Sequence, residues 1–206
     1  SVYRPVERDA AFGATHELDT HFNVIFAGIM GPSQRLQTVI EAAEYLRDVP
    51  EIQFVFIGDG VELPDLKAAV AEKQLTNVRF IDRQPAANMP HFFAWGNALL
   101  VQLRNEPLFH MTIPSKTLSY LACGRPIICA VPGDGADVIR EAGAGLICPP
   151  DDPKQLADTV RQMYELPADE REAMGKAGRA AFLERYTRQK LVSEYEAIFE
   201  RVIAAK

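Results

Sequence analysis

Residues 23–31 have the sequence NVIFAGIMG, in which a strand-like run, Asn23–Ala27, leads into a turn with glycines at positions 28 and 31. β-Branched and aromatic side chains favour extended backbone, and a continuous apolar run is typical of a strand covered on both faces. After the turn, Ser33 has the place of a helix N-cap, and apolar residues then recur at helical spacing. The stretch therefore predicts a strand–turn–helix unit of an α/β protein.

The alternation of strand and helix continues along the chain. The further predicted strands are Gln53–Ile57, Val78–Ile81, Ala98–Leu103, Ile127–Val131 and Gly145–Cys148, and the helices between them are Pro64–Lys73, Met89–Trp95, Ser115–Cys123 and Ala136–Glu141. A loop is expected from the fourth strand to about Pro114. Short connections between alternating elements imply a Rossmann-like, doubly wound parallel sheet of about six strands with helices on both faces.

The composition changes twice along the chain. Residues 1–21 carry proline, glycine and mixed charge without periodicity, so we interpret them as a linker from an N-terminal domain that is missing here. Residues 22–165 form the Rossmann-like domain, and residues 166–206 hold C-terminal helices. Helices are predicted over Pro153–Glu165, Ala168–Leu183 and Thr187–Ala204. The last helix carries an apolar stripe, as expected of a helix that lies on a surface.

Composition excludes several classes of function. The net charge of −6 argues against a nucleic-acid partner, which calls for a basic surface. Three cysteines, an odd number without metal-ligand spacing, indicate buried free thiols in a reducing cytosol. The four histidines also lack ligand spacing, so no metal site is predicted. No apolar run approaches the roughly 20 residues that a membrane-spanning helix needs.

Ligands of an open doubly wound sheet bind beyond the carboxyl ends of its strands. The turn at Gly28 and the stretch Gly58-Asp59-Gly60 both lie at such ends, where glycine lets backbone N–H groups approach an anion. Neither has the GxGxxG or GK[ST] pattern of a dinucleotide or P-loop site. A plain strand-to-helix turn is the alternative interpretation of each.

The segment 112–117, TIPSKT, opens the helix Ser115–Cys123 and is the most informative of these strand ends. A hydroxyl side chain is expected to cap this helix, with Lys116 in its first turn and Thr117 offering a second hydroxyl. A cation there is disfavoured by the helix dipole, so its presence favours an anion bound at the same place. The alternative is a surface lysine without function, and in either case we expect the Lys116 side chain to be exposed.

Five stretches together resemble the C-terminal half of glycosyltransferase family 4. They are FAGIMGPSQRLQTVIEAAEYL, FVFIGDG, NVRFIDRQPAANMPHFFAWGNALLVQL, EPLFHMTIPSKTLSYLACGRPIICAV and ADVIREAGAGLICPPDDPKQLADTV. The resemblance covers about residues 22–205 and is closest to a bacterial subgroup that builds lipopolysaccharide O-antigen and capsule.

The resemblance implies a GT-B architecture, in which two Rossmann-like domains face each other across a cleft. This chain would be the domain that binds the nucleotide sugar, with UDP as the expected nucleotide. The missing N-terminal domain would bind a glycan or lipid-linked acceptor and supply the catalytic residues, so the isolated chain would be inactive. The implied chemistry is retaining hexosyl transfer without a metal ion or cofactor, since the nucleotide sugar is a substrate. The implied location is the cytoplasm, with the full-length protein at the inner face of the membrane.

The resemblance also assigns binding roles. Gly31 would supply backbone to the diphosphate, and Lys116 with the helix start would grip the same group. Gly58 and the strand end Phe80–Asp82 would border the nucleobase, while Glu106 would reach the donor sugar. The candidate binding residues are Gly28, Gly31, Gln34, Arg35, Gly58, Phe80, Asp82, Glu106, Thr112, Ile113, Pro114, Ser115, Lys116, Thr117 and Ser119.

The sequence departs from the family pattern at four positions. Many members carry Arg and Lys where this chain has Ile29 and Gln34, and a pair of glutamates where it has Met111 and Ser119. The second glutamate accepts both ribose hydroxyls, whereas Ser119 can accept one hydrogen bond, and charge-assisted bonds are about twice as strong. Two alternatives therefore stay open: a non-catalytic nucleotide-binding scaffold, and a nucleotide-sugar epimerase of the same fold.

Overall fold

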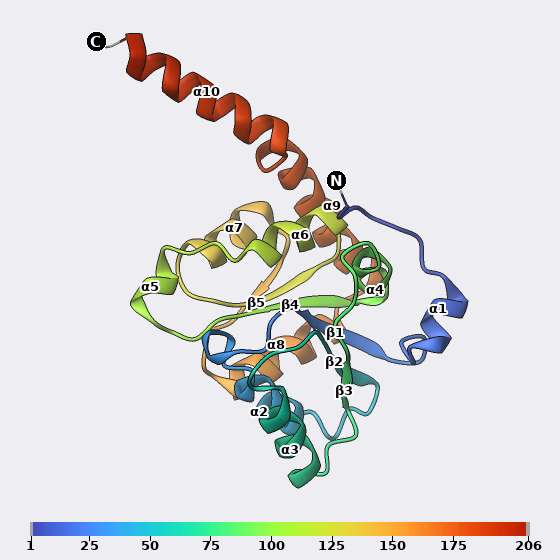
Figure 1. Cartoon of the computed structure of the whole chain (residues 1–206). Helices are drawn as coiled ribbons and strands as arrows, with labels where there is room; N and C mark the ends of the chain where they lie inside the picture. Colours follow the sequence, from blue (N-terminus) through green and yellow to red (C-terminus); the bar gives the residue numbers. More distant parts are fainter. Residues whose placement is uncertain (1, 205–206) are drawn as a thin grey trace.

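The computed structural model describes residues 2–204, and its core is a single sheet of six parallel strands in the order β3-β2-β1-β4-β5-β6 (Figure 1). The strands are β1 (Phe22–Ala27), β2 (Ile52–Ile57), β3 (Val78–Ile81), β4 (Ala98–Gln102), β5 (Ile127–Ala130) and β6 (Gly145–Ile147). This doubly wound parallel sheet confirms the predicted fold class. The strand order reverses between β1 and β4, so the carboxyl end of β1 lies at a topological switch point.

Helices cover both faces of the sheet. One face carries α2 (Gln37–Tyr45), α3 (Leu63–Glu72) and α8 (Pro153–Glu165), and the other carries α4 (Met89–Trp95), α6 (Ser115–Cys123) and α7 (Asp134–Ala142) (Figure 1). Successive strand residues point to opposite faces. In β1, Val24 and Phe26 therefore join one hydrophobic core, while Ile25 and Ala27 join the other. This double burial explains why the strands are continuously apolar.

The first helix after β1 begins later than predicted. Ser33 lies inside a short 3-10 helix, η1 (Pro32–Gln34), and α2 begins at Gln37 with Leu36 as its N-cap. The N-cap role expected of Ser33 is therefore wrong. Arg35, between the two helices, has a left-handed backbone with φ of 43°, which an α-helix cannot accommodate.

Two further helices lie in segments without helical periodicity. Within residues 1–21, α1 (Ala10–Thr15) starts at Asp9, whose side chain accepts a hydrogen bond from the Phe12 N–H group. The Phe12 ring packs edge-on against Phe92 of α4, with ring centroids 4.7 Å apart. The second, α5 (Pro107–His110), is one turn long and lies in the predicted loop. Residue 1 and residues 205–206, at the ends of the predicted segments, lie outside the described residues.

The last two helices differ in how far they are buried against the rest of the domain. α9 (Ala168–Arg185) packs closely on α6 because Gly175 and Gly178 lack side chains; a Cβ at Gly175 would lie 2.3 Å from the Gly124 carbonyl oxygen. α10 (Arg188–Ala204) projects away from the sheet, and none of its described residues is buried (Figure 1). Between residues 2 and 204, no helix has the length and apolarity that crossing a bilayer requires.

Candidate functional site

The turns after β1 and β2 interlock at the carboxyl edge of the sheet. In register, Ala27 pairs with Ile57, so the two strands end level and Gly28 faces Gly58. Both glycines have positive φ, 138° and 144°, and a Cβ at Gly58 would lie 2.1 Å from the Gly28 carbonyl oxygen. Only glycine fits at position 58 for both reasons. The Met30 N–H group also donates to the Asp59 carbonyl at 2.7 Å, which ties the two turns together.

A cavity of about 540 Å³ opens between these turns and the helices α4 and α6, and we call it the glycine cavity. Its lining residues are Tyr3, Ala27, Gly28, Ile29, Gln34, Ile57, Gly58, Asp59, Arg83, Gln84, Ala86, Met89, Phe93, Ser115, Lys116, Ser119 and Tyr120. The volume is within the usual range for small-molecule sites, and the position beyond the carboxyl ends of the strands is where ligands of such sheets bind.

Lys116 reaches from the first turn of α6 to the Gly28 turn. Its Nζ lies 3.6 Å from the centroid of the Phe26 ring, and a Cβ at Gly28 would be 3.1 Å from that nitrogen. The nitrogen is buried, and it has no hydrogen-bond partner within residues 2–204. The expectation that this side chain is exposed is therefore wrong, because the end of β1 covers it. A buried ammonium without a partner is costly, so a lysine in this position either loses its proton or gains a negatively charged partner.

Two opposing effects act on the charge of Lys116. Burial lowers the pKa of its ammonium from the ordinary value of 10.5 to about 7. The face of the Phe26 ring favours the charged form, since a π-system attracts a cation. An anion in the glycine cavity would add to this attraction and raise the pKa again.

The start of α6 has no side-chain cap. Its N-cap residue is Pro114, so the expectation of a hydroxyl cap is wrong. Ser115 lines the cavity instead of capping the helix, and the Ser119 hydroxyl donates a long hydrogen bond of 3.4 Å to the Ser115 carbonyl oxygen. The amide end of the helix, with its partial positive charge, therefore faces the cavity without a competing side chain.

The structure brings part of the candidate set together. The candidates that line the glycine cavity are Gly28, Gln34, Gly58, Ser115, Lys116 and Ser119. Gly31 lies next to them, and its N–H group donates to Gln34 Oε1 at 3.2 Å. These residues come from the turns after two neighbouring strands, from η1 and from α6, which meet at one edge of the sheet.

Arg35 and Glu106 lie outside the glycine cavity. Arg35 is 3.4 Å from Asp151 and lines a separate, smaller cavity of about 220 Å³. Glu106 pairs with Arg104 at 3.1 Å, just before α5. Each of the two side chains is thus held by a charge partner outside the glycine cavity.

The remaining candidates on the way to α6 also face elsewhere. The Thr112 hydroxyl donates to the Leu108 carbonyl oxygen at 2.9 Å, while Ile113 is exposed and Pro114 is half-buried. Thr117 is fully buried, and its hydroxyl has no partner among residues 2–204. It is therefore buried in the interior of the domain and does not line the glycine cavity.

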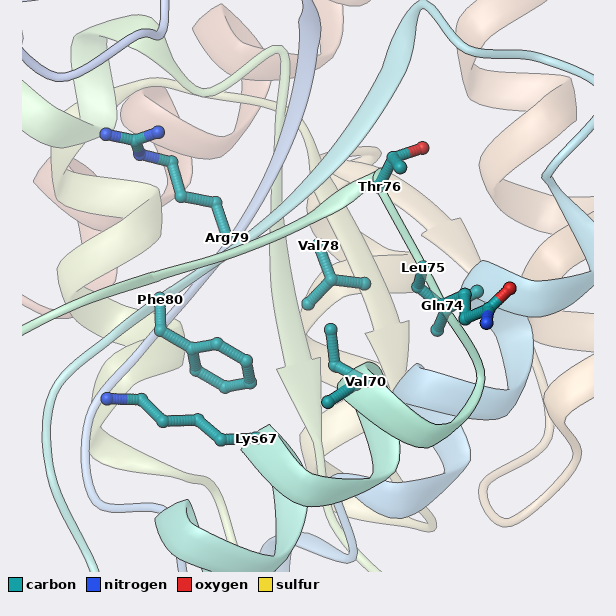
Figure 2. Close-up of a pocket in the computed structure, with 9 residues that line it drawn as sticks. Lys67, Val70, Gln74, Leu75, Thr76, Val78, Arg79 and Phe80 are labelled. Carbon is teal, nitrogen blue, oxygen red and sulfur yellow. The ribbon is translucent and has the colours of Figure 1, made fainter.

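Phe80 lies on the outer edge of the sheet, in a groove between α3 and β3 (Figure 2). The Phe80 ring stacks on the Phe56 ring with centroids 5.2 Å apart, and the Lys67 ammonium lies 5.8 Å from the centroid of the Phe80 ring. Asp82 is exposed at the end of β3, but its neighbours Arg83 and Gln84 do line the glycine cavity. The strand end thus reaches the cavity through the next two residues.

Sequence reasoning missed the aromatic side of the cavity. Tyr3, Phe93 and Tyr120 come from three separate segments, and the Tyr120 hydroxyl accepts a hydrogen bond from the Ala27 N–H group at 3.0 Å. Helical periodicity places Phe93 and Tyr120 in the core without indicating that they also border a cavity. Nothing in residues 1–21 signals that Tyr3 packs there.

The three cysteines and His110 do not line the glycine cavity. Cys123, Cys129 and Cys148 are free and buried, as predicted, and burial raises the pKa of the three thiols to about 12, 12 and 11. The His110 ring shares a 3.1 Å hydrogen bond with Asn105 at the surface. Over residues 2–204, no three side chains of His, Cys, Asp or Glu gather as a metal-ligand set.

The topology defines a doubly wound α/β domain, and the glycine cavity lies at the switch point of its sheet. The family described as glycosyl transferases group 1 matches residues 7–181. The chain belongs to this family.

Curated relatives agree with this assignment. The probable glycosyltransferase WbjE of Pseudomonas aeruginosa is 33% identical over 144 residues, which cover 68% of this chain and 35% of that protein. The putative colanic acid biosynthesis glycosyl transferase WcaI of Escherichia coli K12 is 30% identical over 170 residues, with coverage of 81% and 41%. The chain thus spans less than half the length of these relatives.

Solved structures share the fold. A sucrose-phosphate synthase from Thermosynechococcus elongatus superposes with a TM-score of 0.82 at 20% identity, over 100% of this chain and 51% of that one. Anabaena Alr3699/HepE in complex with UDP-glucose superposes with a TM-score of 0.80 at 16% identity, over 98% and 54%. The fold is therefore the Rossmann-like half of a GT-B glycosyltransferase.

Proposed function

We propose that this chain is the donor-binding half of a retaining family 4 glycosyltransferase, which holds a nucleotide sugar through its diphosphate in the glycine cavity. The observation that carries the proposal is Lys116. Its buried Nζ lies beside the Gly28 turn and over Phe26, without a partner in the described part of the chain. A diphosphate oxygen would provide the missing negative charge.

The surrounding groups suit this ligand. Backbone N–H groups at the glycine turn and the uncapped start of α6 at Ser115 can donate to phosphate oxygens. In sugar transfer the diphosphate is the leaving group, and negative charge develops on it as the glycosidic bond breaks. We place the stabilisation of this charge on Lys116 and these N–H groups rather than on a metal ion, since fixed donors aimed at developing charge lower a barrier strongly.

Several comparisons support UDP as the nucleotide and a cell-surface glycan as the product. The Anabaena HepE structures are complexes with UDP or UDP-glucose, and WcaI is named for colanic acid biosynthesis. We accordingly infer hexosyl transfer from a UDP-sugar to a glycan or lipid-linked acceptor of lipopolysaccharide or capsule. An N-terminal half would bind the acceptor and carry the catalytic residues, and the whole enzyme would lie at the cytoplasmic face of the membrane.

The proposal is tested by calorimetric titration of the chain with UDP, GDP and dTDP, each also as a glucose conjugate. We expect UDP and UDP-glucose to bind most tightly. Lys116→Ala should weaken binding by roughly 1.5–3 kcal/mol, the range for a hydrogen bond to a charged group. Lys67→Ala is the matched control, because Lys67 lies over a phenylalanine ring outside the cavity. Equal UDP affinity in Lys116→Ala and wild type would refute the assignment.

Activity assays on the isolated chain and on the full-length protein separate the alternatives. The isolated chain should bind UDP-glucose without transferring glucose, and measurable turnover would show that the second half is not needed. Sugar transfer by the full-length protein would exclude the non-catalytic scaffold. Conversion of the bound sugar into its epimer would point to the epimerase instead.

A further inference from the structure

The segment that precedes β1 adds an aromatic side chain to the glycine cavity. Tyr3 is half-buried and lines the cavity, and its ring stacks on Phe93 with centroids 6.2 Å apart and 22° between the planes. Phe93 in turn meets Tyr120 edge-on at 5.0 Å. We infer that Tyr3 contacts the nucleobase of the donor and sets the affinity for its nucleoside part, an inference that rests on the proposed function.

The chemistry of the cavity walls assigns this part of the ligand. Lys116 and the Gly28 turn offer a charge and backbone donors, whereas Tyr3, Phe93 and Met89 offer an apolar surface. A phosphate placed against the apolar wall would lose water without gaining donors. A nucleobase has a flat face that stacks on aromatic rings and polar edges that need hydrogen bonds.

Polar side chains for those edges line the same cavity. Arg83 and Gln84 follow Asp82 at the end of β3, and Gln84 Nε2 donates to the Asp82 carbonyl oxygen at 3.1 Å. Arg83 lies 3.5 Å from Asp59 of the second glycine turn. The cavity therefore combines a ring surface with exposed donors, which is the combination that a base requires.

The backbone around Tyr3 is fixed along α4 and α6. A Cβ at Gly124 would lie 3.5 Å from the Pro5 ring, so the segment contacts the end of α6. Arg8 Nε donates to the Ala94 carbonyl oxygen at 2.8 Å, and its guanidinium lies 5.0 Å from the centroid of the Trp95 ring. The contacts of Pro5 with α6 and of Arg8 with α4 hold the segment after Tyr3 in place before a ligand arrives, which lowers the entropic cost of using the tyrosine.

The test compares a ligand that has a base with one that does not. The chain and its Tyr3→Ala and Tyr3→Phe variants are titrated calorimetrically with UDP, UDP-glucose and inorganic pyrophosphate. Tyr3→Ala should weaken UDP and UDP-glucose about 5- to 150-fold, the range for losing a base–aromatic stack, and leave pyrophosphate affinity unchanged. Tyr3→Phe, which keeps the ring, should bind UDP as the wild type does.

Two controls make the outcomes decisive. Tyr45→Ala removes an exposed tyrosine of α2 outside the cavity and should change neither affinity, and retained pyrophosphate binding shows that Tyr3→Ala is folded. An equal loss for UDP and pyrophosphate would overturn the inference. So would an unchanged UDP affinity, or a loss seen with UDP-glucose alone. If Lys116→Ala weakens UDP and Tyr3→Ala does not, the proposed function stands and only the role of Tyr3 fails.

Discussion

Two lysines of this molecule lie over phenylalanine rings, and only Lys116 of the two lines the glycine cavity. Lys67 lies 5.8 Å from the Phe80 ring centroid on the outer edge of the sheet, where the ammonium is exposed (Figure 2). Lys116 lies 3.6 Å from the Phe26 ring centroid, and its nitrogen is buried without a partner among the described residues. The pairs share a cation–π contact, so the contact does not distinguish them. The two lysines differ because the Lys116 ammonium is removed from water without a counter-charge, whereas Lys67 stays exposed.

The largest expected difference between the two lysines is in the pH dependence of stability. The pKa of Lys116 falls from 10.5 to about 7 on folding, so between these values the unfolded chain binds a proton that the folded chain does not. The free energy of unfolding should therefore rise with pH in this window and level off below pH 7. Relative to Lys116→Met, wild type should gain about 2–3 kcal/mol between pH 7 and pH 9.

The measurement is urea unfolding of wild type, Lys116→Met and Lys67→Met at pH 6, 7, 8 and 9. Lys67→Met is the matched control and should follow wild type in parallel, since its ammonium stays in water. A constant difference between wild type and Lys116→Met across the series would mean that Lys116 keeps its charge in the folded, ligand-free protein.

The next effect is proton uptake when a diphosphate binds. At pH 8 the free Lys116 amine is largely neutral if its pKa is about 7, and a bound anion favours the ammonium. Binding should then take up close to one proton, and affinity should fall by about 1.4 kcal/mol per pH unit above pH 7. Calorimetry of UDP binding in buffers of different ionisation enthalpy measures the uptake. Lys116→Met should show none, and Lys67→Met should match wild type.

The smallest effect concerns the ribose. Ser119 lines the glycine cavity one turn after Ser115, where family members have a glutamate. Ser119→Glu should gain on the order of 1 kcal/mol for UDP, because a carboxylate can accept from two hydroxyls, less the cost of its desolvation. The gain should be absent with 2′-deoxy-UDP, titrated under the same conditions. An equal gain for both ligands would place position 119 away from the ribose.

The fold was predictable because its elements have local signals. α6 is found at the predicted residues, Ser115–Cys123, since its periodic apolar positions end at Gly124. The error at Ser33 has a local cause that the sequence does not display, namely the left-handed backbone of Arg35. Helix bounds alone therefore tell little about the conformation of the turn that precedes a helix.

The site was predictable only in part, for a different reason. The importance of Lys116 follows from its place at the start of a helix, but its burial depends on β1, which is far away along the chain. Tyr3 is harder still, since it meets Phe93 and Tyr120 through packing between three distant segments. Local patterns indicate which strand ends form the edge of a site. They do not indicate which remote side chains complete its walls.

The interlocked turns at Gly28 and Gly58 couple the two strand ends mechanically, so we expect this edge of the sheet to move as a unit. The backbone of one turn fills the space that a side chain would need on the other, and a hydrogen bond from the Met30 N–H group to the Asp59 carbonyl ties them, so moving one turn alone would break this contact. Any displacement of the Gly28 turn would pass to β2 and from there to β3. A change in the hydrogen exchange of β3 amides on nucleotide binding would be the mechanical signature of this coupling.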